Sequence, residues 1–274
     1  MAALTKPKVH MGTLTGGEGR EAFAKNPIIL LPMGSHEDQG PHAPMGDYLL
    51  AEKVAELAAI RATEAGTPTY VAHVLPFGGA DWFGPMIGGI AISQATLISV
   101  ITDMVESLHR NGLTRIIVVN GHGGNVGPIA EVARKLYLEK KVVLPSLYLW
   151  KISYGLLPGL IGAEKAKAVS GHGSDPLTSI GLHLFPELIR KDLIPEGKKL
   201  KNDSVLGLPY TGLGTASFDG AEVGLPMEYD DTYHDGVAGG DPKLCSAETG
   251  AVLVEKLTDI VARFSAHFAS KIKA

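Results

Sequence analysis

Cysteine is almost absent from this chain, which has 274 residues and a single cysteine, Cys245. One thiol cannot form a disulfide within the chain, so the class of small secreted domains held together by disulfides is excluded. The sequence also lacks any block of lysine and arginine, and its formal net charge is −4 at pH 7. Nothing in this balance favours nucleic acid or an acidic membrane surface as a partner.

Long hydrophobic runs are missing as well. The first residues, MAALTKPKVHMG, contain no signal-peptide apolar core, and no later run reaches the length that spans a bilayer. We therefore expect a cytoplasmic protein with a small-molecule partner and no membrane or nucleic-acid partner.

The chain has enough apolar residues for a large core, with 45% hydrophobic and 20% charged residues. Apolar runs of strand length alternate with stretches of helical periodicity, a pattern typical of βαβ units and a mainly parallel sheet. The expected strands cover residues 27–33, 69–75, 115–119 and 142–150. The expected helices cover residues 47–65, 93–111, 126–140, 160–169, 176–185 and 246–271. No linker divides the chain, which predicts a single α/β domain over residues 1–274.

Two stretches show weak patterning. Residues 1–26 are expected to wrap the surface, and residues 191–243 read as irregular and rich in Gly, Pro and Asp. An irregular stretch of that length is unusual in a compact domain, so we expect it to be functional or to lie at a subunit contact.

Three polar loops follow predicted strands or precede predicted helices: SHEDQGPHAPMGD at 35–47, NGHGGN at 120–125 and SGHGSD at 170–175. Loops at the carboxyl ends of parallel strands emerge on one edge of the sheet, so Glu37, Asp47, His122 and His172 are able to converge. Carboxylates with imidazole suit a divalent ion such as Mn, Fe or Zn.

Blander interpretations exist for each loop. A polar loop can simply be solvated surface, but such a loop would not need so much Pro and Gly. A lone histidine is often only a structural hydrogen-bonding group. A phosphate-binding role for NGHGGN is disfavoured, because the segment has neither Walker Lys-Ser/Thr nor GxGxxG spacing.

The chain resembles the creatininase (creatinine amidohydrolase) family over most of its length. The resemblance rests on the segments LPMGSHEDQGPHAPMGD, LPFGGADWFGPMIGGIAIS, VVNGHGGN, SGHGSDPLTS and GVAGGDPKLCSAETG. It implies a three-layer α/β sandwich, a homohexamer, and a metal-dependent hydrolase of cyclic amides and related C–N bonds. It further implies a two-metal centre in which Asp47 matches the bridging aspartate, while Glu37 and His122 match the other ligands of the first metal.

Two departures from the family pattern concern the second metal. Gln39 stands where the family has a histidine ligand, and Leu177 stands where its third motif has a glutamate five residues after the histidine. The spacing from Gly-Pro-His to Asp47 is also one residue shorter than in creatininase. We expect one divalent ion per subunit, Zn, Mn or Fe, with Asp47 as a terminal ligand.

Other nearby polar residues leave a second possibility open. A second metal site could be rebuilt from His36, Asp38 or Asp175, and Gln39 and His42 are further candidates for such a site or for substrate contacts. The aromatic pair Trp82-Phe83 stands where relatives often carry Glu-His, so the substrate pocket is expected to differ and creatinine is not the expected substrate.

The leading functional hypothesis is a metal-dependent amidohydrolase that cleaves a cyclic amide or formamide-type C–N bond in a small polar molecule. The metal would activate water and polarise the carbonyl, and His172 would serve as general acid or base. Two alternatives remain: a metal-dependent lyase or isomerase that stabilises an enediolate, and a binding protein that has lost the chemistry.

Overall fold

The structure is a computed structural model that describes residues 7–79, 81–195, 201–233 and 236–272. Its centre is a parallel four-stranded sheet in the order β2-β1-β3-β4. The strands are β1 Ile28–Met33, β2 Thr69–Val71, β3 Ile116–Asn120 and β4 Ser146–Tyr148. All four strands run the same way, so their carboxyl ends meet at one edge of the sheet.

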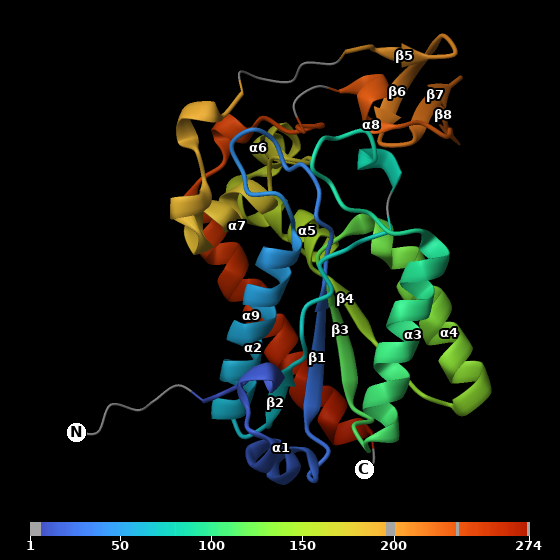
Figure 1. Ribbon diagram of the computed structural model, residues 1–274. Coiled ribbons are helices and arrows are strands. Elements are labelled where there is room, and N and C mark those ends of the chain that lie inside the picture. The colour runs from blue at the N-terminus through green and yellow to red at the C-terminus, as the bar shows by residue number, and fades with distance from the viewer. Residues whose placement is uncertain (1–6, 80, 196–200, 234–235, 273–274) are drawn as a thin grey trace.

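Both faces of strand β1 are buried, which explains why its sequence is an unbroken apolar run. Ile28 and Leu30 face one core together with helices α2 and α9, whereas Ile29, Leu31 and Met33 face a second core with helices α3 and α4. The sheet therefore lies between two helical layers (Figure 1). The predicted three-layer α/β sandwich with a mainly parallel sheet is confirmed.

Helices α2 and α9 cover one face of the sheet, and α3 and α4 cover the other (Figure 1). The long α-helices are α2 Tyr48–Glu64, α3 Gln94–Arg110, α4 Val126–Lys140, α5 Leu149–Ile161 and α9 Ala247–Lys271. The shorter ones are α1 Gly16–Phe23, α6 Ala163–Val169, α7 Leu177–Leu184 and α8 Tyr229–Thr232. The 3₁₀ turns are η1 Met11–Thr13, η2 Asp81–Phe83, η3 Gly123–Asn125, η4 Pro186–Leu188, η5 Lys191–Leu193 and η6 Pro242–Leu244. None of the helices in the described part of the chain is long and apolar enough to cross a membrane.

Several helices begin or end where the sequence predicts, because the predicted capping residues occupy the cap positions. Ser93 accepts a hydrogen bond from the backbone N–H of Thr96 at the start of α3, and Asn111 occupies the C-cap position before Gly112, whose φ is +79°. Ser246 caps α9 in the same way through Thr249.

The segment 142–150 was predicted as a strand, and that prediction is wrong for most of its length. Only Ser146–Tyr148 pairs with β3, as the edge strand of the sheet, and helix α5 begins at Leu149. The predicted helix at 160–169 is likewise two helices, because Gly162 adopts φ +84° between α5 and α6.

The stretch 191–243 is more regular than predicted. It contains a second, antiparallel sheet with strands β5 Ser204–Val205, β6 Leu208–Gly212, β7 Thr215–Phe218 and β8 Ala221–Gly224. Residues 196–200 and 234–235 of this stretch lie outside the described residues. The small sheet lies beyond the carboxyl ends of the parallel strands (Figure 1). Residues 1–26 also hold a regular element that was not predicted, helix α1, which is capped by Thr15 and Glu18.

Candidate active site

Asp47 is the point where strand β1 and helix α2 come together. It occupies the N-cap position of α2, as the sequence predicts, but its side chain does not cap the helix. Oδ1 instead accepts the backbone N–H of Ser35 at 2.7 Å, and Oδ2 lies 3.0 Å from Nδ1 of His122. Gly34 allows this approach, because a Cβ at that position would collide with the Asp47 carboxylate and the backbone of Tyr48.

His122 follows strand β3 in a loop that asparagine side chains hold in shape. Asn120 accepts the backbone N–H of His122 at 3.0 Å and donates to the His122 carbonyl at 2.7 Å. Asn125 donates to the Gly34 carbonyl at 3.0 Å, which ties this loop to the loop after β1. The motif NGHGGN therefore positions a histidine at the end of the sheet.

Glu37, Asp47 and His122 form a compact buried group. Their ligand atoms all lie within 4.8 Å of one another, and no other group of His, Cys, Asp and Glu with metal-site geometry occurs in the described part of the chain. Glu37 Oε1 is 3.4 Å from His122 Nδ1. Each of the three residues is at most 4% exposed.

The electrostatics of this group favour a positive charge at its centre. Burial raises the pKa of Asp47 to about 6, although His122 opposes that shift. Burial also acts to raise the pKa of Glu37, but the nearby His122 outweighs it and the net shift is downward. Burial acts to lower the pKa of His122, yet the two carboxylates raise it to about 10. The two buried carboxylates thus require a positive charge beside them, which either a protonated His122 or a bound cation supplies.

A divalent ion fits this group by its donor chemistry. Glu37 Oε2 and His122 Nε2 are buried, and no described residue forms a hydrogen bond with either atom. Leaving such atoms unpaired costs about 1–3 kcal/mol each, more if they are charged. Two carboxylates and one imidazole are a common three-ligand set for Zn, Mn or Fe, and such a set leaves coordination positions open for water or substrate.

His172 reaches the same site from the loop between α6 and α7. Its Nε2 lies 2.6 Å from the carbonyl oxygen of Asp38, which only accepts hydrogen bonds, so Nε2 carries the proton. Nδ1 therefore presents its lone pair, and it faces Glu37 Oε1 at 3.8 Å. Burial lowers the pKa of His172, which keeps the ring neutral. The ring stacks on Phe83, with 4.1 Å between centroids and 21° between planes.

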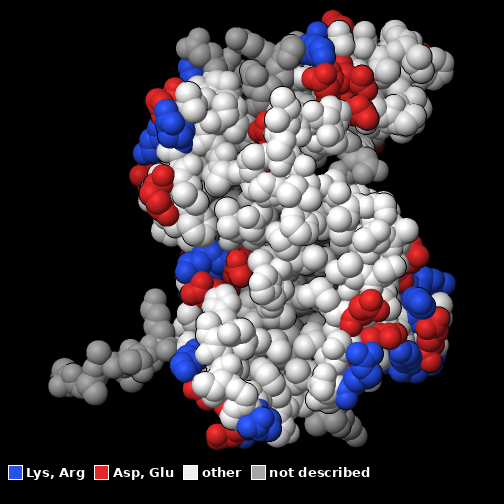
Figure 2. All heavy atoms as spheres, viewed as in Figure 1, with Lys and Arg blue, Asp and Glu red and all other residues white. Residues whose placement is uncertain are grey.

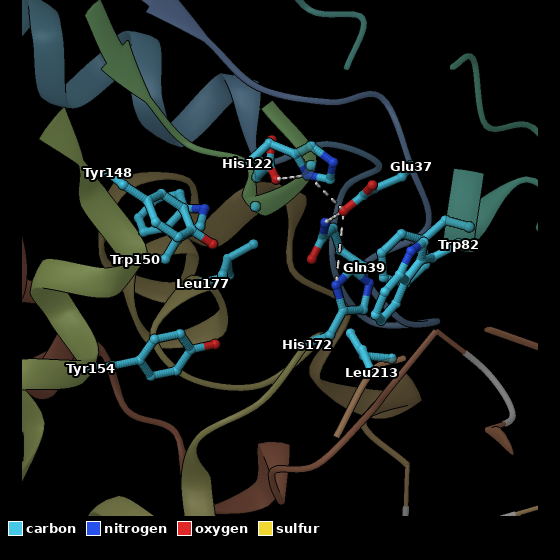
Figure 3. Close-up of a pocket in the computed structure, with 14 residues that line it drawn as sticks. Glu37, Gln39, Trp82, His122, Tyr148, Trp150, Tyr154, His172, Leu177 and Leu213 are labelled. Atoms are coloured by element: carbon cyan, nitrogen blue, oxygen red, sulfur yellow. Dashed lines mark hydrogen bonds and ion pairs between the residues drawn. The ribbon is translucent and has the colours of Figure 1, made fainter. Parts of the chain in front are cut away.

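These side chains line one end of a cavity of ≈ 390 Å³. Figure 3 shows His122 and Glu37 at this end and Tyr154 across from them, with its hydroxyl directed inward. The lining residues are Glu37, Gln39, Asp47, Trp82, Phe83, His122, Gly123, Gly124, Tyr148, Trp150, Tyr154, His172, Leu177 and Leu213. Lys and Arg are absent from this lining, as far as the described residues show.

The aromatic wall of the cavity was not anticipated from the sequence. Tyr148 ends strand β4, and Trp150 and Tyr154 belong to α5. The indole N–H of Trp150 donates to the carbonyl of Gly121, which fixes the wall to the loop that carries His122. Burial raises the pKa of Tyr154 to about 12, so its hydroxyl stays protonated. The sequence shows these aromatic residues, but the prediction of a strand over residues 142–150 did not place Tyr148 and Trp150 beside Tyr154 in a cavity wall.

Gln39 and Leu177 both line the cavity. Gln39 Nε2 donates to Glu37 Oε1 at 2.9 Å, and its Oε1 has no hydrogen-bond partner among the described residues. Leu177 begins helix α7 and is 8% exposed. The two positions at which the sequence departs from the family pattern therefore bring no charged ligand to the cavity.

The other residues considered for a second metal do not line the cavity. His36 packs against Tyr48, with 6.1 Å between ring centroids, on the far side of the loop. The Asp38 carboxylate accepts the backbone N–H of Gly40 at 2.7 Å and so stabilises its own turn.

His42 and Asp175 are also engaged elsewhere. His42 Nε2 lies 3.0 Å from Thr178 Oγ1, and Asp175 Oδ1 accepts the backbone N–H of Ser179 at 3.1 Å. Both contacts involve residues of helix α7, so these side chains join the loop after β1 and the His172 loop to that helix.

Comparisons with known proteins identify the family of the chain. The profile of the family described as "Creatininase: Creatinine amidohydrolase" matches residues 12–265. The chain is 27% identical to the 3-dehydro-scyllo-inosose hydrolase of Thermotoga maritima over 92% of this chain and 80% of that protein. It is 28% identical to the mycofactocin precursor peptide peptidase of Mycolicibacterium smegmatis over 66% of each chain. It is also 28% identical to the creatinine amidohydrolase of Pseudomonas putida, over 68% of this chain and 75% of that one.

Solved structures show the same fold. A structure described as "Creatininase Mn" superposes with a TM-score of 0.73 and 22% identity, over 96% of this chain and 99% of the other. A mutant creatininase described as "Zn-Zn type" gives a TM-score of 0.73 at 21% identity, with the same coverage.

Proposed function

The chain belongs to the creatininase family, and from this premise we propose that it is a metal-dependent hydrolase acting on a small polar molecule. The observation that carries this proposal is the buried Glu37, Asp47 and His122 group at the end of a cavity that also holds His172. A structural role alone does not account for three buried ionisable groups at the end of a cavity large enough for a small substrate.

We propose that Glu37, Asp47 and His122 hold one divalent ion per subunit, with Asp47 as a terminal ligand. Related creatininase structures are described as Mn and Zn-Zn forms, and this donor set suits both ions. A second ion would find few partners, because Gln39 is neutral and Leu177 has no ligand atom. His36, Asp38 and Asp175 point to other contacts.

When bound, the ion supplies Lewis-acid chemistry, in that it polarises a carbonyl oxygen and makes water more acidic. His172 Nδ1 carries the free lone pair of a neutral imidazole, and it is the atom placed to take a proton from the attacking water. The same nitrogen then delivers that proton to the leaving nitrogen. The Asp38 carbonyl holds the ring in the tautomer that this role requires.

The substrate class that we propose is a cyclic amide or formamide-type compound, with cleavage of its C–N bond. The cavity of ≈ 390 Å³ fits a small molecule, and its aromatic walls suit a flat one. Trp82 and Phe83 line the cavity at the positions where relatives often carry Glu-His, so creatinine is not the expected substrate.

A second candidate reaction is hydrolysis of a neutral cyclic ketone, and one relative favours it. The Thermotoga maritima protein, whose alignment covers 92% of this chain, is described as a hydrolase of 3-dehydro-scyllo-inosose, a compound without nitrogen. The uncharged cavity lining would accept such a ring.

One experiment separates the two reactions. Purified protein loaded with Mn or Zn is incubated with a panel of cyclic amides, formamides and cyclic keto-polyols. Release of an amine with a new carboxylate identifies C–N cleavage, and a new carboxylate alone from a nitrogen-free ring identifies the second reaction. His172→Ala protein serves as the control for contaminating enzymes. Absence of turnover on every class, with the metal in place, would contradict the proposed function.

A further inference from the structure

The amide oxygen of Gln39 is a buried acceptor that no described residue satisfies. Gln39 is 2% exposed, and its Oε1 lacks a hydrogen-bond partner in the described structure. Buried amide oxygens are nearly always paired in folded proteins, so an unpaired one at a cavity wall points to a ligand. None of the residues assigned to metal binding or proton transfer accounts for it.

The neighbouring carboxylate determines which way this amide faces. Glu37 Oε1 is an acceptor, so the group 2.9 Å away from it must be the amide nitrogen of Gln39. The oxygen then lies on the other side of the amide, turned toward the cavity wall between Leu177 and His172 (Figure 3). Glu37 is itself held by its contact with His122, so the direction of the amide oxygen is fixed before a substrate arrives.

The surroundings of this oxygen restrict the charge of the substrate. The described lining contains two carboxylates and neither Lys nor Arg. An anionic group entering this cavity would lose its hydration without gaining a cationic side chain, which is unfavourable. Leu177, beside the oxygen, offers no hydrogen-bonding group at all.

We propose that Gln39 is a specificity-determining residue whose Oε1 accepts a hydrogen bond from an N–H or O–H group next to the reacting carbonyl of a neutral ring. This inference rests on the proposed function, since it names the substrate class of the same site. It assigns Gln39 to the substrate and not to a metal. A carboxylate or phosphate held away from the ion is disfavoured by the same lining, because no described Lys or Arg there replaces its hydration.

The test uses binding and does not require turnover. The chain has two tryptophans, Trp82 and Trp150, and both line this cavity, so intrinsic tryptophan fluorescence reports on it directly. Metal-loaded protein is titrated with 2-pyrrolidinone and N-methyl-2-pyrrolidinone, which differ in the ring N–H. A second pair, 2-hydroxycyclohexanone and 2-methoxycyclohexanone, tests an O–H donor. Pyroglutamate, a pyrrolidinone with a carboxylate, tests the exclusion of anions.

Wild-type protein should bind the donor-bearing member of at least one pair about tenfold more tightly than its methylated partner, equivalent to ~1.4 kcal/mol. Pyroglutamate should bind more weakly than 2-pyrrolidinone. In Gln39→Met protein the preference for the donor should disappear, whereas Leu177→Met, a methionine placed in the same cavity wall, should retain it. Gln39→Asn, which withdraws the oxygen by one methylene, provides a second variant in case Gln39→Met does not fold.

Three results would overturn the inference: equal binding within both wild-type pairs, tighter binding of pyroglutamate, or an unchanged donor preference in both Gln39 variants. Each differs from failure of the proposed function, which would show as wild-type protein without bound metal in elemental analysis. Gln39→Met protein at saturating metal should hold the same number of ions as wild type.

Discussion

The imidazole of His172 lies flat against the ring of Phe83, with centroids 4.1 Å apart. This stack and the hydrogen bond from Nε2 to the Asp38 carbonyl hold the ring from its face and from its edge. Nδ1 is thereby directed at Glu37 in the buried group, although His172 and Phe83 lie almost ninety residues apart in the chain.

Phe83→Leu should lower kcat by about two- to tenfold, because an aromatic stack contributes roughly 0.5–1.5 kcal/mol beyond simple burial. Bound metal should stay at the wild-type level, since Phe83 is not one of the three residues of the buried group. Steady-state kinetics with elemental analysis check both points, and Phe83→Tyr, which retains the stack, is the matched control. Loss of metal in Phe83→Leu would show that the loop and not the stack was disturbed.

His172→Ala should lower turnover by roughly 10²–10⁴-fold, the range expected when a general acid–base group is removed. The fold and the bound ion should be retained, because His172 is not one of the three grouped ligands. Circular dichroism and elemental analysis establish these conditions before rates are compared. Near-normal turnover would make the histidine a structural hydrogen-bonding residue.

Wild-type protein should contain one tightly bound divalent ion per subunit, and Ala substitution of Glu37, Asp47 or His122 should remove most of it. Each change leaves only two of the three ligands of the group. His36→Ala is the control, since His36 lies outside the cavity and should keep the full metal content. Anomalous diffraction from metal-replete crystals would contradict this prediction if it showed two full peaks about 3.5–4 Å apart, the usual two-metal spacing.

His42 should make the protein less stable in mild acid. Burial lowers its folded-state pKa to about 4, against about 6.5 in the unfolded chain. Between pH 6.5 and pH 4, His42 is therefore protonated in the unfolded state and neutral in the folded state. The free energy of unfolding falls over this range by at most about 1.4 kcal/mol per pH unit. The effect is absent above pH 7.

His42→Gln protein should be less stable than wild type at pH 7, because the contact with Thr178 is changed. The difference in free energy of unfolding between wild-type and His42→Gln protein should become smaller as the pH is lowered from 7 to 4, since glutamine does not titrate. Urea unfolding at several pH values measures this difference, and contributions from Asp47 and Glu37 cancel between the two proteins. A constant deficit over this range would contradict the assignment.

We expect a closed homo-oligomer, with a hexamer as the state that family membership suggests. Ile87 is 96% exposed and Ile90 is 50% exposed in the loop after η2, which is unfavourable for a free surface. Figure 2 shows charged side chains gathered mainly toward the margins of one face, with much of its centre uncharged. Sedimentation velocity should give a mass that is a multiple of 28.8 kDa. A single species of monomer mass at micromolar concentration would contradict the expectation.

The sequence alone could predict the part of the site that depends on loops following buried strands. The apolar run before Gly34 predicts β1, and the parallel sheet then requires that Glu37, Asp47 and His122 lie near one edge. Glycine spacing around His172 likewise predicts close backbone packing, and a Cβ at Gly173 would indeed collide with the backbone carbonyl of Gly236. These inferences rest on an apolar run and on glycine spacing, and the structure retains the local conformations that both patterns predict.

The cavity wall could not be predicted in the same way. Tyr148, Trp150 and Tyr154 lie where β4 gives way to α5, and a short edge strand running into a helix has no strong periodicity of its own. The small antiparallel sheet was missed for a related reason. Its strands are two to five residues long, and the turns between them depend on glycines such as Gly207 and Gly220 that also occur in irregular loops.

The turn between β6 and β7 contacts the cavity from outside the parallel sheet. Leu213 reaches the lining, and Gly214 leaves room for the Trp82 ring against which a Cβ would collide. None of the charged or hydrogen-bonding groups of the site comes from this hairpin. In evolutionary terms the hairpin is therefore a part of the pocket wall that can change without altering the buried ionisable groups. Exchange of the hairpin can give a descendant protein a differently shaped pocket, while the machinery on the parallel sheet is inherited unchanged.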